Sequence, residues 1–255
     1  MNKPCKELKR IARNSLTGKY GIPMGALLIA TLISLIIELP FSMVQGEHPT
    51  AIQNIIFLAA DFLIALINVI LSAGITAIHL NLARNKQISL GILFYGFKNR
   101  PDRFILASLL ETLLLLIGAI PTLIGAAILV LKNPMAGLIF GILTIVSVIL
   151  MTIIMLNIAL TPYFVLEHPD MGISNCVKNS VHFMRGHKGK LLYIYLSFVG
   201  LQLLCILSFG IGSLWVAPYQ NQTLANFYLD VTGQPLATDP NASETDTSMH
   251  FEQCI

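Results

Sequence analysis

Five apolar stretches, each about twenty residues or longer, constrain this chain more than any other feature of its sequence. They cover residues 22–44, 52–80, 104–131, 136–166 and 191–209. A bilayer core is about 30 Å thick, and backbone amides inside it must pair within their own segment, so a spanning helix needs ~20 apolar residues. The sequence therefore predicts an all-α fold, a polytopic transmembrane helix bundle with five spans.

A sixth stretch, residues 211–229, is less clearly a span. Its four amide side chains are costly in lipid, and Pro218 removes a helical hydrogen bond. These amides are Gln220, Asn221, Gln222 and Asn226. The segment could cross the membrane against other helices, re-enter it, or lie in the interface.

The composition supports lipid as the main solvent. Hydrophobic residues make up 55% of the chain and charged residues only 11%, whereas a soluble domain carries roughly a quarter charged residues. This excludes a secreted disulfide scaffold, a nucleic-acid-binding domain, a coiled coil and a disordered chain. The 4 cysteines are widely spaced and no His lies at metal-ligand spacing, so we expect no disulfide framework and no zinc site.

The basic residues set the predicted orientation. When the predicted spans alternate, all of the 16 Lys and Arg residues except Lys132 fall on one side. By the positive-inside rule, the N-terminus is cytoplasmic and the chain is a multi-pass protein of the cell membrane.

Amphipathic segments are expected next to the spans on the basic side. Residues 1–21 form a cytoplasmic basic region, in which residues 3–18 fit a helix with Leu8, Ile11 and Leu16 on one face. Such a helix can lie on the inner leaflet, where anionic lipid attracts each base by about 1 kcal/mol. The alternative is a topogenic charge cluster with no lipid partner. Residues 170–185 fit a second interfacial helix.

The sequence changes character after the last apolar stretch. We therefore divide the chain into the basic helix, a transmembrane domain over residues 22–229, and a tail over residues 230–255. The tail contains no Lys or Arg and is rich in acidic and small polar residues. This composition predicts a flexible acidic appendage.

Three carboxylates fall within predicted spans: Glu38, Asp61 and Glu111. Each costs about 2.5–3.5 kcal/mol on insertion scales, so such a group normally faces a partner or a wet cavity. Glu38 and Asp61 lie at similar depth and could face each other, sharing a proton on a proton or cation pathway. The alternative is a pair of protonated or snorkelling acids hydrogen-bonded to neighbouring Asn, Ser or Thr side chains.

Histidines and glycines form two further patterns. His79, His168, His182 and His187 lie near the predicted cytoplasmic face, where we expect solvated interfacial histidines rather than pH sensors or metal ligands. The Gly137-x-x-x-Gly141 pattern predicts close helix packing.

Several residues in the carboxy-terminal half carry a family resemblance. They are Met184, Gly186, His187, Gly210, Gly212, Pro218 and Tyr219. With weaker matches from Glu7 onward, they make the chain resemble a family of bacterial integral membrane proteins known as domain of unknown function 975. The resemblance implies a multispan cytoplasmic-membrane protein without an assigned catalytic residue. It also favours counting residues 211–229 as a sixth membrane segment.

Enzyme motifs are absent from the sequence. It contains no Walker loop, no Gly-x-Gly-x-x-Gly, no Gly-x-Ser-x-Gly and no His-Glu-x-x-His. We expect a non-enzymatic protein with no cofactor, whose partners are the bilayer, anionic inner-leaflet lipids and another membrane protein, but not nucleic acid. The alternatives are a small transporter using Glu38 and Asp61, and an interfacial lipid-modifying enzyme near His182, Arg185 and His187.

Overall fold

The computed structural model describes residues 3–44, 50–130 and 135–236, and every regular element in these ranges is a helix. The elements are α1 (Cys5–Leu16), α2 (Gly21–Val44), α3 (Ala51–Ala83), η1 (Leu90–Phe94), α4 (Tyr95–Lys98), α5 (Pro101–Val130), α6 (Ala136–Ile158), α7 (Thr161–Glu167), α8 (Ile173–Phe183), α9 (Lys188–Leu207) and α10 (Ser213–Val231). The prediction of an all-α helical bundle is confirmed.

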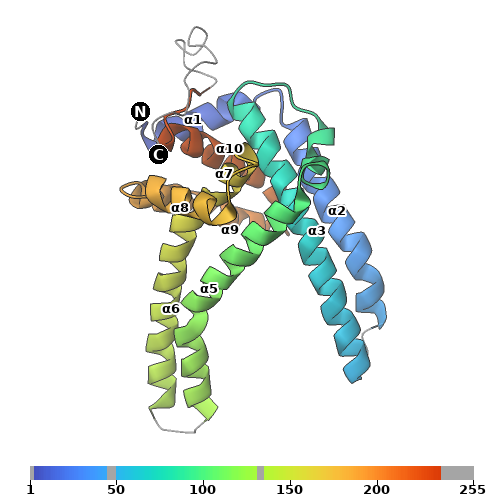
Figure 1. Ribbon diagram of the computed structural model, residues 1–255, viewed down its shortest axis with the longest axis vertical. Helices are drawn as coiled ribbons and strands as arrows, with labels where there is room; N and C mark the ends of the chain where they lie inside the picture. The colour runs from blue at the N-terminus through green and yellow to red at the C-terminus, as the bar shows by residue number, and fades with distance from the viewer. Residues whose placement is uncertain (1–2, 45–49, 131–134, 237–255) are drawn as a thin grey trace.

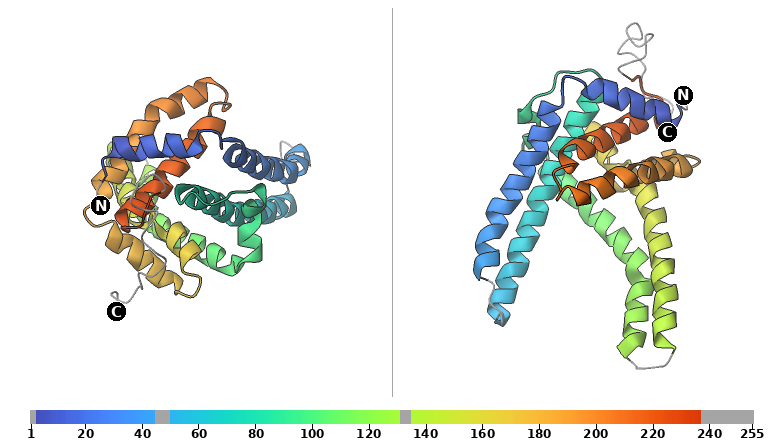
Figure 2. Two further views of the ribbon diagram at one scale, coloured as in Figure 1. Left: turned by 90° about the horizontal axis from the view of Figure 1, so that it is seen from above. Right: turned by 180° about the vertical axis from the view of Figure 1, so that it is seen from behind.

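Two long helical hairpins extend from one compact end of the molecule (Figure 1). The first hairpin is α2/α3 and the second is α5/α6, and the two diverge away from that end. We call the compact end the cap; it consists of α1, α7, α8, α9 and α10. Figure 2 shows α1, α9 and α10 lying across the ends of the hairpins rather than alongside them.

The hairpins expose apolar side chains along their length. Ile36 is 67% exposed, Phe62 65% and Ile145 62%. Five helices are long and apolar enough to cross a membrane: Gly21–Pro40, Ala51–Ala83, Pro101–Val130, Ala136–Glu167 and Lys188–Leu207. Because water would oppose so much continuous apolar exposure, these helices indicate a membrane-embedded protein.

The structure refines three of the predicted spans. The fourth, residues 136–166, is broken between α6 and α7, where the Ser180 hydroxyl donates to Asn157 O (2.7 Å) and accepts from Leu160 N (3.2 Å). The fifth corresponds to α9, which is long and apolar enough to cross a membrane but lies across the ends of the hairpins rather than alongside them (Figure 2). The sixth corresponds to α10, which is not among the five helices of spanning length and hydropathy.

Close packing in the hairpins uses glycines other than the predicted pair. No atom lies within 4 Å of a Cβ built at Gly137 or Gly141, so this pattern does not mark a helix contact in the described ranges. Instead, Gly118 and Gly125 of α5 lie against α6, and a Cβ at Gly125 would be 3.1 Å from the Phe140 ring. A glycine permits close packing only where it faces the neighbouring helix. The spacing of glycines in the sequence does not show which of them do so.

A buried serine stabilises the bend that Pro121 introduces in α5. Pro121 lies inside the helix and has no N–H to donate. Ser147 of α6 is 2% exposed; its hydroxyl donates to Gly118 O (3.0 Å) and accepts from Thr122 N (3.0 Å). Ser147 therefore satisfies backbone groups that a regular helix would pair internally.

The ordered cap extends beyond the predicted domain boundary at residue 229. Helix α10 ends at Val231, Asp230 is 2% exposed and Leu236 is fully buried. Residues 230–236 therefore pack with the domain instead of beginning the tail. The rest of the predicted tail, residues 237–255, lies outside the described residues.

Candidate functional site

Helix α10 carries a row of buried polar side chains through the centre of the cap. Gln222, Thr223 and Asn226 are fully buried. Helix α1 covers this row: its Leu8, Ile11 and Leu16 are at most 2% exposed, and Asn226 Nδ2 donates to Leu8 O (3.3 Å). The predicted apolar face of α1 is therefore correct, but it packs on α10 instead of resting on lipid.

Asp230 joins three parts of the cap. Its carboxylate accepts from Lys190 Nζ of α9 at 2.6 Å and from the backbone N–H of Lys3 at 3.2 Å for each oxygen. Lys3 precedes α1, whose N-cap residue Pro4 offers no side-chain cap. The carboxylate thus supplies negative charge where the α1 dipole favours it, and it neutralises a cation in the first turn of α9.

A second cluster surrounds Glu167, at the end of α7. Its carboxylate accepts from Arg84, from the Tyr228 hydroxyl (2.5 Å) and from Gln234 Nε2 (3.1 Å). The Tyr228 ring stacks on Tyr163, with centroids 4.8 Å apart. Burial and the neighbouring Glu167 charge raise the pKa of Tyr228 above its usual range. This cluster ties α3, α7 and α10 together and has the features of a structural network.

His79 of α3 is buried beside a small cavity. It is 1% exposed, and the cavity of about 170 Å³ is lined by Ser72, Ile75, Thr76, His79, Tyr163 and Asn221. The prediction of a solvated interfacial histidine is wrong for this residue, because α10 covers the face of α3 on which it lies. His182 is exposed, whereas His168 and His187 are half-buried.

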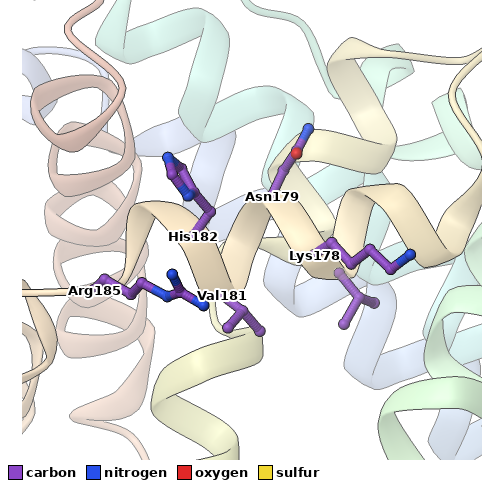
Figure 3. Close-up of a pocket in the computed structure, with 6 residues that line it drawn as sticks. Lys178, Asn179, Val181, His182 and Arg185 are labelled. Atoms are coloured by element: carbon purple, nitrogen blue, oxygen red, sulfur yellow. The ribbon is translucent and has the colours of Figure 1, made fainter. Parts of the chain in front are cut away.

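Helix α8 presents a basic surface at the edge of the cap (Figure 3). An open depression of about 420 Å³ is lined by Val177, Lys178, Asn179, Val181, His182 and Arg185. Lys178 and Arg185 are exposed and lie on opposite sides of Val181. Within the described residues, neither of these two bases forms an ion pair. We call this the α8 surface.

The inner side of α8 is held firmly against the rest of the protein. Cys176 and Ser180 are fully buried, and the Ser180 hydroxyl occupies the break between α6 and α7. Before α8, the Arg103 guanidinium donates to Met171 O, and Arg100 Nη1 donates to Pro169 O (2.9 Å). The α8 surface is therefore carried by a fixed element.

The three predicted intramembrane carboxylates are not gathered into one site. Glu38 of α2 and Asp61 of α3 are exposed, and Glu111 of α5 is half-buried. No hydrogen bond or ion pair joins any two of them within the described ranges. Among the neighbouring polar side chains, Asn68 Oδ1 of α3 accepts from the Ser34 hydroxyl of α2 (2.8 Å). Their use in transport stays a prediction.

Sequence patterns did not identify most of the polar groups that the cap brings together. Arg84 and Lys190 counted only as charges that set orientation, and Asp230 was assigned to the tail. Gln222 and Asn226 were the one usable signal, because amides in an otherwise apolar stretch need partners when buried. Their partners lie far away in the chain, so the sequence could not show which groups they bond.

The residues behind the family resemblance lie mainly in the two turns around α9. Gly186 (φ +83°) follows α8, and Gly210 (φ +86°) lies between α9 and α10; a side chain would strain both backbones. A Cβ at Gly212 would meet the Ser208 hydroxyl at 2.9 Å. The remaining four support these turns or line α10: Met184 is fully buried, His187 Nδ1 lies 3.1 Å from Phe183 O, Pro218 is buried, and Tyr219 packs edge-on against Phe198.

No group of three or more metal-ligating side chains suited to a metal ion occurs among the described residues. Comparison with curated proteins and with solved structures gave no match. The family model described as Protein of unknown function (DUF975) matches residues 1–235, which include all the helices of the hairpins and the cap. The chain therefore belongs to this family.

Proposed function

We propose that this chain is a non-enzymatic integral membrane protein whose α8 surface binds the headgroups of anionic phospholipids. In this proposal the ends of the hairpins that carry the cap face the cytoplasm, with the N-terminus inside. The observation that carries it is the pairing of exposed Lys178 and Arg185 with the apolar Val177 and Val181 in one depression.

The chemistry of the α8 surface matches the two ends of a phospholipid. Arg185 can donate two parallel hydrogen bonds to phosphate oxygens, and Lys178 supplies a second positive charge. The two valines offer apolar contact to the upper part of an acyl chain. Two further exposed bases on α1, Lys6 and Arg13, add to the positive charge of the cap. An anionic leaflet attracts each such base by about 1 kcal/mol.

The proposal is tested with the full chain in nanodiscs of neutral phosphatidylcholine containing a small fraction of fluorescent phosphatidylglycerol. Lys178→Gln combined with Arg185→Gln should weaken phosphatidylglycerol binding about 30-fold, because two bases at about 1 kcal/mol each are lost. Lys86→Gln combined with Lys98→Gln removes the same charge from two exposed positions outside the cap. This control should change binding much less.

Equal losses in both double variants would show general attraction to basic residues and would refute a site on α8. Equal binding of neutral and anionic lipid by the unaltered protein would refute the proposal altogether. The lipid is recovered and chromatographed after incubation, because a modified lipid product would replace binding with catalysis near His182.

A further inference from the structure

The cavity beside His79 is lined by polar groups that become progressively more buried toward the histidine. We call it the His79 cavity, lined as described above. Along one face of α3, Ser72 is exposed, Thr76 is half-buried and His79 is 1% exposed. Tyr163 of α7 and Asn221 of α10 complete the polar lining, and Ile75 is apolar. The cavity therefore leads from the surface of a membrane-spanning helix toward a buried imidazole.

The hydrogen bonds around His79 favour one position for its proton. The Gln222 side chain satisfies its neighbours when its nitrogen donates to His79 O (3.2 Å) and His79 Nδ1 (3.0 Å) while its oxygen accepts from Ala83 N (3.2 Å). In the opposite orientation the amide nitrogen would lie 3.4 Å from Asn226 Oδ1, but it would also face a backbone N–H, and the amide oxygen would face the carbonyl oxygen of His79. Nδ1 is thus an acceptor, so the neutral ring carries its proton on Nε2.

This arrangement leaves a buried donor without a partner. His79 Nε2 has no hydrogen-bonding partner among the described residues, although it is shielded from the surface. Buried polar groups normally find a partner, because leaving one unpaired is costly. Nδ1 is turned to Gln222. Nε2–H belongs to a ring that lines the cavity but is itself enclosed, so an acceptor in the cavity reaches it only after a shift of the lining side chains. What it needs is an oxygen acceptor.

The depth of the cavity selects the kind of acceptor. Helix α3 has 33 residues and is therefore about 50 Å long, whereas the hydrocarbon core is about 30 Å thick. If the hydrocarbon core of the membrane begins near Ala51, about twenty residues of α3 cross it. The polar face of α3 that begins at Ser72 then lies just outside the hydrocarbon core, on the side of the cap. This is the level of the glycerol and ester groups of a lipid. None of the lining residues carries a charge while His79 is neutral.

We infer that the His79 cavity binds the uncharged glycerol–ester part of a membrane lipid, with an ester carbonyl or glycerol hydroxyl oxygen accepting a hydrogen bond from His79 Nε2–H. Thr76, Tyr163 and Asn221 supply further hydrogen-bonding groups to the same ligand. The cavity is separate from the α8 surface, and the inference does not depend on the binding of anionic lipid there.

The test uses the full chain in maltoside micelles, with thermal unfolding followed by the fluorescence of Trp215. Monoolein should raise the unfolding midpoint saturably, and an ether analogue lacking the ester carbonyl will show whether that oxygen or the hydroxyls are recognised. Thr76→Val and Tyr163→Phe each remove one hydroxyl while keeping the side-chain shape, and each should weaken the apparent affinity at least fivefold. Lys178→Gln with Arg185→Gln should leave monoolein binding unchanged.

Matched controls are available for both substitutions. Thr112→Val on α5 removes a hydroxyl that, like that of Thr76, bonds the carbonyl four residues earlier. Tyr193→Phe alters a tyrosine of α9 that is 62% exposed. Neither control should affect monoolein binding.

Three results would overturn the inference. The first is the absence of a saturable shift with monoolein or its ether analogue in the unaltered protein. The second is an equal shift with free glycerol at the same concentration, which would assign the cavity to a soluble polyol. The third comes from ¹⁵N spectra of histidine-labelled protein: a proton on Nδ1 of His79 would remove the donor on which the inference rests, whereas a proton on Nε2 supports it.

Discussion

Replacing Asp230 with Asn should destabilise the cap more than any other single polar substitution at a charge pair in the described protein. The Asp230 side chain is 1% exposed and its partner Lys190 is 13% exposed, with 2.6 Å between the charged atoms. Removing one member of a buried pair costs about 3–5 kcal/mol, because the desolvated charge that stays behind loses a close partner of opposite sign. Asn keeps one acceptor for the Lys3 amide, so we expect about 3 kcal/mol.

Thermal unfolding in detergent, followed by Trp215 fluorescence, measures this loss. At about 2–4 °C per kcal/mol for a chain of this size, the midpoint should fall by about 6–12 °C. Asp170→Asn is the matched control: its carboxylate lies 3.4 Å from Arg100, but the side chain is 96% exposed. Solvent screens that pair, so the control should leave the midpoint unchanged.

A double-mutant cycle separates the ion pair from other effects of the substitution. Lys190→Met alone should also destabilise the protein, whereas Asp230→Asn with Lys190→Met should cost clearly less than the sum of the two single changes. If the two changes add to within about 0.5 kcal/mol, the residues are not energetically coupled and the proposed role of Asp230 is wrong.

Three further changes probe the packing and the pH dependence. Gly74→Ala should prevent normal folding, because the added Cβ would lie 1.9 Å from a backbone oxygen of η1. Gly137→Ala is the control: the space around it is open, so this change should be neutral or should stabilise the protein by up to about 1 kcal/mol. The yield and monodispersity of the two variants in detergent distinguish these outcomes. Ser147→Ala should lower stability by about 1–3 kcal/mol in detergent unfolding, because two backbone groups at the α5 bend lose their partner. Because burial and Glu167 raise the pKa of Tyr228 in the folded protein, the neutral hydroxyl makes its full contribution to stability below the unfolded-state pKa of 10.0. This contribution decreases as the pH rises above 10.0. Tyr228→Phe should therefore flatten the loss of stability with increasing alkalinity, and an unchanged slope would contradict this assignment.

Local patterns in the sequence predicted the helices and their buried faces better than they predicted which helices pack together. The spacing of Leu8, Ile11 and Leu16 correctly identified the buried face of α1, because helical periodicity is a property of one short segment. The same spacing could not show that α10 covers this face. The two helices meet through residues 218 positions apart, as in the bond from Asn226 to Leu8, and no local signal links such distant segments.

Depth along a helix was likewise easier to predict than direction around it. The position of His79 near one end of an apolar stretch was correct, but the sequence did not show that α10 covers that side of α3. Gly137 and Gly141 had the spacing of a contact motif, yet they face open space, whereas Gly125 faces α6. Which side a residue faces depends on the packing of several helices, which single-segment patterns do not contain.

The contact between α1 and α10 has a consequence for the order in which the protein matures. Ribosomes add about 5–20 residues per second, so roughly 10–40 s pass between the synthesis of Leu8 and that of Asn226. During this interval the first helix lacks its main packing partner, α10, while both hairpins have already left the exit tunnel. Assembly of the cap is therefore the last step of biogenesis. A polypeptide truncated before α10 retains its membrane segments but cannot cover the apolar face of α1.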